Sequence, residues 1–490
     1  MPCTTILVGS KASYDGSTMI ARNDDGHFTE KKAVVIEPDK QPKIYKSKIG
    51  QLTIELPDHP LRYTRIENVD PKDGIWPASG VNSEGVGMTA TETITSNPRV
   101  MGADPYVLPP LSAGKKKGKK AAAGGIGEED LVLLVLPYIR SAREGVLRLG
   151  ELLEKYGTYE PNGIAFNDTK EVWWLETIGG HHWIARRVPD DRYVVMPNQF
   201  GLDNFSWEDA YGEKKENMCS PDLKEFVEKN HLDLGLQGGF NPRLAFGSNA
   251  DSDHVYNTPR AWYMLRYFNP RSFVWDGEDA DFTPLSDDLP WSMVPERKIT
   301  VEDVKYILSS YYQGTPYDPY TKEGDKSLHG IYRPIGISRT SFMTCLQARP
   351  YMPKEISNIE WLCMGCNAFN AFVALYPNVS KFPAYFSTTE MRVDSNKFFW
   401  ANRLISVIAD AHFAATSIHI ERYQNTMQSL CHKHIIETDK KYLESKDLKD
   451  LEKANEEMAA IAKVQTEKCL SNVLAAASDK MKIGYSRTDN

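Results

Sequence analysis

Cys3 is the first residue of the sequence whose side chain could act as a nucleophile, and it follows only Met1 and Pro2. If these two residues were removed, one residue would carry both a thiol and a free α-amine. Their reference pKa values are about 8.5 and about 7.7–8.0, so the amine can accept the thiol proton near neutral pH. Cys3 would then supply nucleophile and base for acyl transfer. Its position also fits an ordinary residue at the start of a β-strand.

Two other groups of residues have side chains that bind metals. Cys363 and Cys366 form a CxxC pair, and Cys431, His432 and His434 could complete a set of zinc ligands. The pair falls in an apolar strand-like segment and the second group in a helical one, so we expect neither a metal nor an organic cofactor. The seven cysteines are scattered and odd in number, which is typical of reduced thiols rather than a disulfide framework.

The elements around Cys3 are predicted to form a β-hairpin. Residues 5–9 and 18–21 are rich in β-branched and apolar side chains, and the sequence between them, at residues 14–17, is typical of a turn. We expect Cys3 to begin the first strand and Arg22 to end the second.

Further strands are predicted from the same pattern. β-prone segments flank turn-like residues in three more places, and the last two pairs are expected to continue as one β-meander. These segments cover residues 74–81 and 86–93, 163–166 and 172–178, and 183–188 and 193–196. Two later strand-like segments cover residues 360–364 and 372–376.

Helices are predicted in two regions. Apolar side chains recur at helical spacing between Asp130 and Tyr156, and Gly157 follows as a C-cap, which indicates one amphipathic helix packed on a sheet. From residue 401 onward the chain is predicted to be helical, with Ser445 as an N-cap. Residues 112–126 are rich in Lys, Gly and Ala, and we expect a mobile surface loop there rather than a site for an anionic partner.

Length and composition narrow the class of protein. The chain has 490 residues, of which 41% are hydrophobic and 25% charged, so it can bury a large core in one or more domains. A net charge of -8 argues against nucleic acid or an anionic membrane as a partner. The longest apolar run, residues 131–139, is interrupted by Pro137 and is much shorter than the roughly 20 residues of a membrane span. The N-terminus lacks the features of a secretory signal, so we expect a cytoplasmic protein.

Several spaced segments together resemble the dipeptidase A family of N-terminal-nucleophile (Ntn) cysteine peptidases, which are related to bile-salt hydrolases, penicillin V acylases and secernins. The resemblance is carried, in order, by residues 3–6, 15–18, 21–25, 85–93, 176–187, 197–198 and 257–263. It implies an α+β fold, a four-layer αββα sandwich over residues 1–400 with the lysine-rich insertion at 112–126. Residues 401–490 would form a helical extension packed on the same domain, which could also serve as a contact surface in a homo-oligomer.

The resemblance also implies roles for individual residues. Cys3 would be the nucleophile, freed by processing after Pro2, with Arg22 and Asp25 beside it. A guanidinium near the sulfur favours the thiolate, and a carboxylate can hold the α-amine or the ammonium group of a substrate. An ordinary surface pair of Arg22 and Asp25 is the alternative.

Two more residues are implied by the resemblance. Asn198 would donate a hydrogen bond to the tetrahedral oxyanion, and Arg260 could bind the C-terminal carboxylate of a dipeptide bidentately. A turn-forming asparagine beside Pro197 and an arginine at a helix start are the alternatives. The related amidases use a further asparagine near residues 91–93, where this sequence has none. A backbone N–H near Thr91 is the expected substitute.

The expected activity is hydrolysis of dipeptides of broad side-chain type. The Cys3 thiolate would attack the scissile carbonyl, the leaving amine would depart protonated, and water activated by the Cys3 α-amine would hydrolyse the thioester. One alternative is an amidase of the same chemistry that acts on a conjugated bile acid or penicillin V. The other is a non-catalytic regulatory protein similar to the secernins, which an unprocessed N-terminus would favour.

Overall fold

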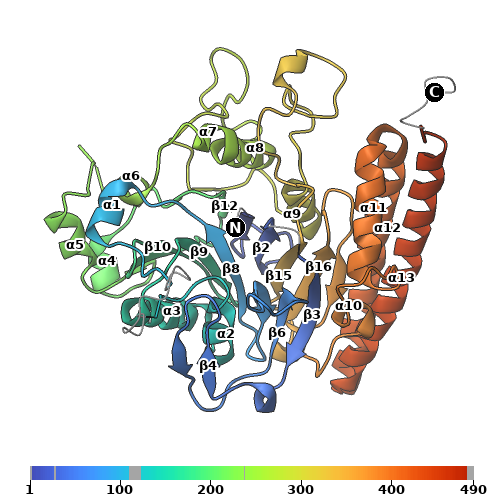
Figure 1. Cartoon of the computed structure of the whole chain (residues 1–490), viewed down its shortest axis with the longest axis horizontal. Helices are drawn as coiled ribbons and strands as arrows, with labels where there is room; N and C mark the ends of the chain where they lie inside the picture. Colours follow the sequence, from blue (N-terminus) through green and yellow to red (C-terminus); the bar gives the residue numbers. More distant parts are fainter. Residues whose placement is uncertain (1–2, 27–28, 110–122, 237, 483–490) are drawn as a thin grey trace, which may run out of the picture.

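The structure is a computed structural model that describes residues 3–26, 29–109, 123–236 and 238–482 (Figure 1). Its centre is a seven-stranded sheet and a six-stranded sheet, and every strand pair in them is antiparallel. The seven-stranded sheet consists, in order, of β14 (Ser292–Met293), β12 (Tyr193–Met196), β1 (Cys3–Val8), β2 (Thr18–Asp24), β15 (Phe342–Ala348), β16 (Asn358–Met364) and β17 (Val373–Leu375).

The six-stranded sheet is built from the middle of the chain. Its strands are, in order, β13 (Asn217–Cys219), β11 (His182–Arg187), β10 (Val172–Ile178), β9 (Asn162–Asn167), β8 (Gly87–Thr93) and β7 (Ser79–Val81). Two small sheets pair β3 (Lys31–Ile36) with β6 (Tyr63–Asn68), and β4 (Ile44–Lys46) with β5 (Thr53–Glu55).

The two large sheets pack face to face. Leu7 of β1, Ile20 of β2 and Leu346 of β15 share one buried cluster with Ala165 of β9 and Trp174 of β10. Because successive side chains of a strand point to opposite faces, Cys3 and Thr5 lie on the same face as Leu7, and Thr4 lies on the other. Every residue of β1 is buried, so both of its faces are covered.

Helices cover the outer faces of both sheets. α2 (Leu131–Val135) and α3 (Ala142–Tyr156) lie over the six-stranded sheet, where Val146 and Leu149 join a cluster with Phe166 and Trp173. α8 (Thr258–Phe268) and α9 (Val301–Leu308) lie over the seven-stranded sheet, where Trp262 and Ile307 cluster with Ile6.

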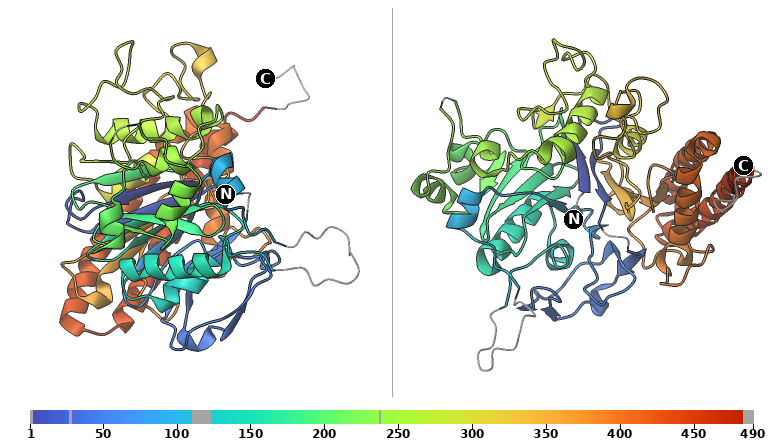
Figure 2. Two further views of the ribbon diagram at one scale, coloured as in Figure 1. Left: turned by 90° about the vertical axis from the view of Figure 1, so that its left-hand side faces the viewer. Right: turned by 45° about the horizontal axis from the view of Figure 1, so that its top comes forward.

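The remaining helices are short except for three at the C-terminal end. The short ones are α1 (Pro98–Ala103), α4 (Trp207–Tyr211), α5 (Leu223–Lys229), α6 (Pro242–Phe246), α7 (Asp253–Tyr256) and α10 (Ala384–Ser387), with 3-10 turns at Pro38–Lys40, Leu136–Tyr138, Lys326–Leu328 and Lys354–Ile356. α11 (Phe398–Ala411), α12 (Phe413–Ser445) and α13 (Lys449–Ser478) lie side by side along β16 and β17 (Figure 2). A buried Arg349–Asp439 ion pair joins α12 to the chain after β15, with a shortest N–O distance of 2.6 Å.

The predicted hairpins form. β1 pairs with β2, and β7 pairs with β8, and the later strands at residues 360–364 and 372–376 correspond to β16 and β17. The expected meander is wrong at its last step, because β11 stays in the six-stranded sheet while β12 pairs with β1 in the other sheet. The alternation of apolar and polar side chains identifies a strand but does not show which sheet the strand joins.

Three predicted boundaries are wrong. β2 continues past Arg22 to Asp24. The single helix predicted between residues 130 and 156 is divided into α2 and α3, because Pro137 lies in the 3-10 turn between them and cannot donate a helical hydrogen bond. Ser445 is the last residue of α12 rather than an N-cap, and Leu448 precedes α13.

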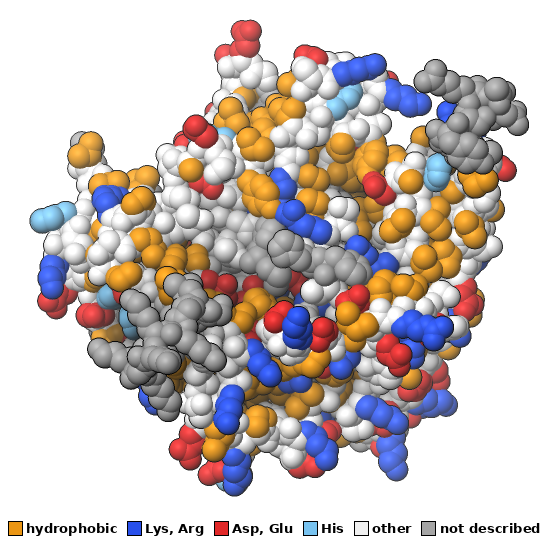
Figure 3. All heavy atoms as spheres, in the orientation of Figure 1, with side chains coloured by type: hydrophobic (Ala, Val, Ile, Leu, Met, Phe, Trp, Pro, Cys, Tyr) orange, Lys and Arg blue, Asp and Glu red, His pale blue; other side chains and the backbone are white. Residues whose placement is uncertain are grey.

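The remaining features concern the surface. Residues 112–122 of the predicted lysine-rich loop lie outside the described residues. Basic and acidic side chains are interspersed on the face seen in Figure 3, which agrees with the modest net charge of the sequence. Within the described ranges, none of the helices combines the length and the apolar character needed to cross a membrane.

Candidate active site

Cys3 is completely buried at the start of β1, between the two large sheets. It pairs with Asp24 across the β1–β2 hairpin, and Thr5 pairs with Arg22. Paired residues of antiparallel strands have side chains on the same face, so Cys3, Thr5, Arg22 and Asp24 all point toward the six-stranded sheet. The hairpin therefore brings the predicted nucleophile and the predicted arginine together through local sequence alone.

Arg22 contacts the thiol directly. Its Nη2 lies 2.9 Å from Cys3 Sγ and 2.9 Å from Glu128 Oε1, and the guanidinium is almost fully buried. Its Nη1 donates to the carbonyl oxygens of Ala78 and Ala90, at 3.3 and 2.9 Å. These bonds to β8 and to the residue before β7 hold the guanidinium in one orientation at the sulfur.

Three carboxylates lie around the thiol and Arg22. Glu92 of β8 accepts a 2.7 Å hydrogen bond from Thr5 Oγ1, and Asp24 lies 2.8 Å from Lys31 Nζ. Burial raises the pKa of Cys3 to about 12; the positive charge of Arg22 acts in the opposite direction, and Glu92, Asp24 and Glu128 raise the pKa further. In the chain that retains Met1 and Pro2, the thiol is therefore neutral at pH 7.

Glu92 is itself unusual, because it is buried and only one of its two oxygens has a hydrogen-bond partner in the described structure. Burial raises its pKa to about 7, and the positive charge of Arg260 opposes this shift most strongly. Its carboxyl group can therefore gain or lose a proton in the pH range in which most enzymes work.

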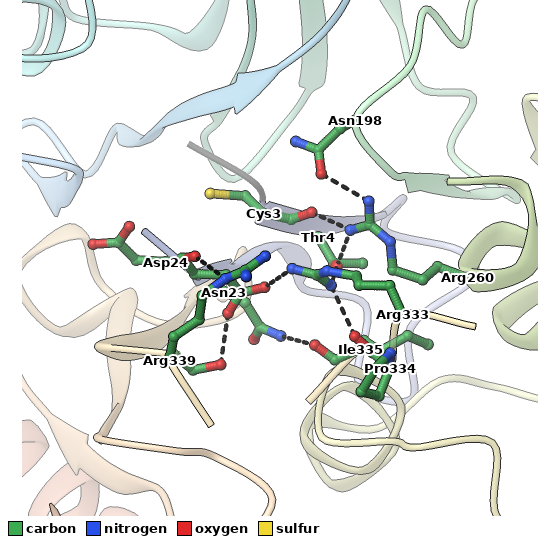
Figure 4. A network of polar contacts seen from close by, with 12 residues as sticks. Cys3, Thr4, Asn23, Asp24, Asn198, Arg260, Arg333, Pro334, Ile335 and Arg339 are labelled. Atoms are coloured by element: carbon green, nitrogen blue, oxygen red, sulfur yellow. Dashed lines mark hydrogen bonds and ion pairs between the residues drawn. The ribbon is translucent and has the colours of Figure 1, made fainter. Parts of the chain in front are cut away.

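Arg260 lies on the opposite face of β1 and is also fully buried (Figure 4). Its Nη1 donates to the Cys3 carbonyl oxygen and, at 2.7 Å, to Thr4 Oγ1. Its Nη2 donates at 2.7 Å to Asn198 Oδ1 and at 2.7 Å to Asn257 Oδ1, and its Nε donates at 2.7 Å to the Tyr256 carbonyl. All five N–H groups of the guanidinium are engaged.

This arrangement corrects the role expected for Arg260. No N–H group remains for the carboxylate of a dipeptide, and the side chain instead fixes the backbone of Cys3 and the amide of Asn198. Burial lowers the pKa of Arg260 to about 9, with a further contribution from Arg333, so the side chain is still charged at pH 7.

Asn198 follows β12, and Figure 4 shows it above Cys3 with its amide joined to Arg260. Its Oδ1 accepts from Arg260, so its Nδ2 must point the other way, and this group donates at 2.8 Å to the Thr93 carbonyl. An amide nitrogen carries two hydrogens, and the second has no partner within the described part of the chain. Asn198 thus has a donor available for an oxyanion.

The segment in which a second donor is expected lies on β8. The β8–β9 register shifts between Ala90 and Glu92, so that Thr91 has no residue opposite it in the ladder. Thr91 is completely buried, and its Oγ1 has no partner among the described residues. A bulge of this kind interrupts the hydrogen-bond ladder of the sheet at Thr91.

Asp25 and Arg22 are both buried and do not form the surface pair that was the alternative to an active-site role. The Asp25 carboxylate instead accepts from Arg333 Nη2 and from Thr340 Oγ1, both at 2.6 Å. Arg333 also reaches Thr4 Oγ1, at 3.4 Å. Asp25 therefore belongs to a network on the Arg260 side of the hairpin rather than to the thiol side.

Sequence reasoning missed Glu92, Glu128, Arg333 and Asn257. The only local signal was the spacing of Asn257 and Arg260, three residues apart at the start of α8, where their side chains are neighbours. The other three come from segments far from Cys3 in sequence. Groups of His, Cys, Asp and Glu that could hold a metal ion are absent from the described ranges.

An open cavity lies beside Asn198. It has a volume of about 500 Å³, and its walls include Thr93, Asn198, Tyr256 and Asn257. Three of these residues belong to the hydrogen-bond network of Arg260 and Asn198. The geometry as a whole, a buried thiol beside a guanidinium with amide donors and a cavity next to it, suits acyl transfer through a cysteine.

Comparisons with known proteins agree with this class of site. The family model described as "Peptidase family C69" matches residues 2–426. The "Dipeptidase" of Bifidobacterium longum is 49% identical, with both chains covered over 100% of their length. The "Probable dipeptidase A" of Streptococcus pyogenes is 48% identical over 100% of both chains, and the "Dipeptidase A" of Lactobacillus helveticus is 42% identical over 99% of both.

Among solved structures, penicillin V acylase from Agrobacterium tumefaciens matches at 12% identity with a TM-score of 0.31, over 76% of this chain and 86% of the other. The family model and the full-length relatives decide the assignment. The chain belongs to peptidase family C69.

Proposed function

We propose that the chain is a cytoplasmic dipeptidase whose nucleophile is Cys3 after removal of Met1 and Pro2. The observation that carries this proposal is the 2.9 Å contact between Arg22 Nη2 and the thiol, in a site that also contains an Asn198 amide with a donor available. The similarity to proteins named as dipeptidases supports the substrate class. Seven free cysteines are compatible with a reducing compartment.

The proposed fold is the four-layer αββα sandwich of the Ntn hydrolases. Two sheets that face each other, with helices on both outer faces, support it. We propose residues 1–400 as the catalytic domain and residues 401–490 as its helical extension, although α11 crosses this boundary.

The proposed reaction begins with proton transfer from the Cys3 thiol to its own α-amine. Arg22 stabilises the thiolate, which attacks the scissile carbonyl carbon. The Asn198 Nδ2–H and the Thr91 N–H donate to the oxyanion. The tetrahedral intermediate collapses as the leaving amine takes the proton, and a thioester remains on Cys3. The α-amine then removes a proton from water, which hydrolyses the thioester; these steps use only groups of this chain and water.

Other residues position the reacting groups. Arg260 fixes the Cys3 carbonyl and turns the Asn198 amide so that its N–H groups point away from the guanidinium. Asp25 holds Arg333 against Thr4, which limits movement of the first residues of β1. Glu92 and Asp24 lie on the thiol side and would balance the charge of a newly exposed α-ammonium group.

A substrate panel with variants tests the proposal. Purified protein, with its N-terminus determined by mass spectrometry, is given free dipeptides, N-acetylated dipeptides, a glycine-conjugated bile acid and penicillin V. We expect hydrolysis of dipeptides, loss of this activity in Cys3→Ala, and full activity in Cys345→Ser, because Cys345 is an equally buried cysteine of the same sheet outside the site.

Two results would contradict the proposal. Preferred cleavage of penicillin V or the bile-acid conjugate would assign the chain to the amidases. Absence of any hydrolysis by a processed chain would favour a regulatory protein. Cleavage of N-acetylated dipeptides as fast as free ones would show that the substrate ammonium group is not recognised and would leave the dipeptidase proposal unchanged.

A further inference from the structure

Four arginines lie near Cys3, and three of them use most of their N–H groups in hydrogen bonds within the protein. Arg260 donates all five of its N–H groups to neighbouring oxygens. Arg22 divides its Nη groups among Cys3, Glu128 and two carbonyl oxygens. Arg333 donates to Asp25, Thr4 and the Pro334 carbonyl. Arg22 keeps only its Nε–H, and Arg333 keeps its Nε–H and one Nη2–H, but the charge of Arg333 is already paired with the Asp25 carboxylate.

Arg339 is different. Its Nε donates at 2.9 Å to the Asp25 carbonyl, and its Nη2 donates to the Tyr256 hydroxyl. Within the described chain it has no carboxylate partner, and both Nη1 hydrogens and one Nη2 hydrogen are unused. The side chain is only half-buried, so these hydrogens can be reached by a ligand. A guanidinium with adjacent unused N–H groups binds a carboxylate bidentately.

The backbone that carries Arg339 is held firmly next to the nucleophile. The Ser341 N–H donates at 2.7 Å to the carbonyl of Asp24, and Asp24 is the direct partner of Cys3 across the hairpin. At the other end of this loop, the Gly336 N–H donates at 2.8 Å to the Ser310 carbonyl. Arg403 of α11 donates at 2.9 Å to the carbonyl of Ser338. These bonds fix Arg339 relative to Cys3 before any ligand binds.

The two groups that accept hydrogen bonds from Arg339 are the Asp25 carbonyl, close to Cys3 in the hairpin, and the Tyr256 hydroxyl, at the cavity. Asp25 directly follows Asp24, and Tyr256 lines the cavity beside Asn198. Figure 4 shows Arg339 reaching toward the start of β1 from the side of Asp24, away from Arg260. Facing Cα atoms of paired strands are about 5 Å apart, and one further residue adds about 3.8 Å along the chain. Arg339 is therefore connected to Cys3 through two residues of the hairpin, Asp24 opposite Cys3 and then Asp25, whose carbonyl accepts the 2.9 Å hydrogen bond from Nε.

We infer that Arg339 binds the C-terminal carboxylate of the dipeptide substrate, an inference that rests on the proposed function. In a dipeptide, the carboxylate is one residue beyond the scissile carbonyl. Each added residue would move it by about 3.3–3.6 Å, which is beyond the length of a hydrogen bond. Arg339 thereby also sets the length of the substrate, because a tripeptide cut at its first bond would place its carboxylate out of reach.

Kinetics with matched substrates test this inference. A dipeptide, the same dipeptide with a C-terminal amide, and the tripeptide extended by one residue are compared in the processed wild type, Arg339→Gln and Arg339→Lys. We expect the wild type to prefer the dipeptide to its amide by about 10- to 100-fold in kcat/KM, mainly through KM, as charge-assisted hydrogen bonds allow. Arg339→Gln should lose this preference, and Arg339→Lys should keep part of it.

Arg403→Met is the matched control, because it loosens the same loop without changing the ligand-facing arginine. It should lower activity on the dipeptide and the amide by the same factor. A wild-type preference that survives Arg339→Gln unchanged would overturn the inference while leaving the dipeptidase proposal intact. If the wild type cleaved neither substrate, the proposed function would fail. The role of Arg339 would then be tested by calorimetric binding of the dipeptide and its amide to Cys3→Ala, and equal affinity for the two would overturn the inference.

Discussion

Removal of the Glu128 charge should make the Cys3 thiol more acidic. Glu128 Oε1 and Cys3 Sγ each lie 2.9 Å from Arg22 Nη2, so at most twice that distance, 5.8 Å, separates them. Two charges at this separation interact by about 3 kcal/mol at an effective dielectric constant of about 20, which is about two pKa units. Because the surroundings relax after the change, we expect Glu128→Gln to lower the thiol pKa by roughly one to two units.

The assay is an ultraviolet titration of the thiolate. The titration is recorded for Glu128→Gln and for the double variant that also carries Cys3→Ala. The difference between the two absorbance changes is the signal of the Cys3 thiol, without that of the six other cysteines. Mass spectrometry confirms that the compared proteins begin at the same residue. Glu160→Gln is the control, because Glu160 accepts at 2.6 Å from the Glu128 backbone N–H and does not contact Arg22 or the thiol. An unchanged or higher thiol pKa in Glu128→Gln would refute this account of the site.

Three further predictions concern catalysis and stability. Asn198→Ala should lower kcat for dipeptides by about 10²–10³-fold with little change in KM, since one oxyanion donor is lost; a change in kcat below tenfold would exclude this role. Burial raises the pKa of Glu360 from 4.5 to about 7, so its contribution to stability is present below pH 4.5 and is lost as pH rises through 7. In urea unfolding, the free energy of unfolding of Glu360→Gln relative to wild type should therefore rise by roughly 2–4 kcal/mol between pH 5 and pH 8. The same difference between variant and wild type at both pH values would contradict this prediction. Asp439→Ala leaves Arg349 buried without its partner and should cost about 3–5 kcal/mol in the same assay; a loss below 1 kcal/mol would show that this pair does not hold α12 to the sheet.

Local sequence was sufficient to predict the hairpin that carries Cys3. The turn at residues 14–17 sets the register of β1 and β2, and that register alone puts Arg22 on the same face as Cys3. The roles proposed for Asn198 and Arg260 follow only from the resemblance to a family, because nothing in their own neighbourhood of the sequence points toward Cys3.

The contacts between distant segments could not be predicted. Glu128 and Glu92 come from a turn and a strand of the other sheet, and their contact with the thiol side depends on how the two sheets pack. The role of Arg260 was misjudged for a related reason, since its five hydrogen bonds are visible only when all its neighbours are in place. Arg339 gave no sequence signal, because what distinguishes it from Arg333 is the lack of a carboxylate partner in the described chain.

The most direct test of the central claim is the intact mass of the purified, active protein. The account predicts that Met1 and Pro2 are both absent, so that Cys3 is the first residue and its α-amine is free to act as the base. An active protein that retains Pro2 would contradict the account, because its Cys3 nitrogen would be part of a peptide bond and could not accept the thiol proton.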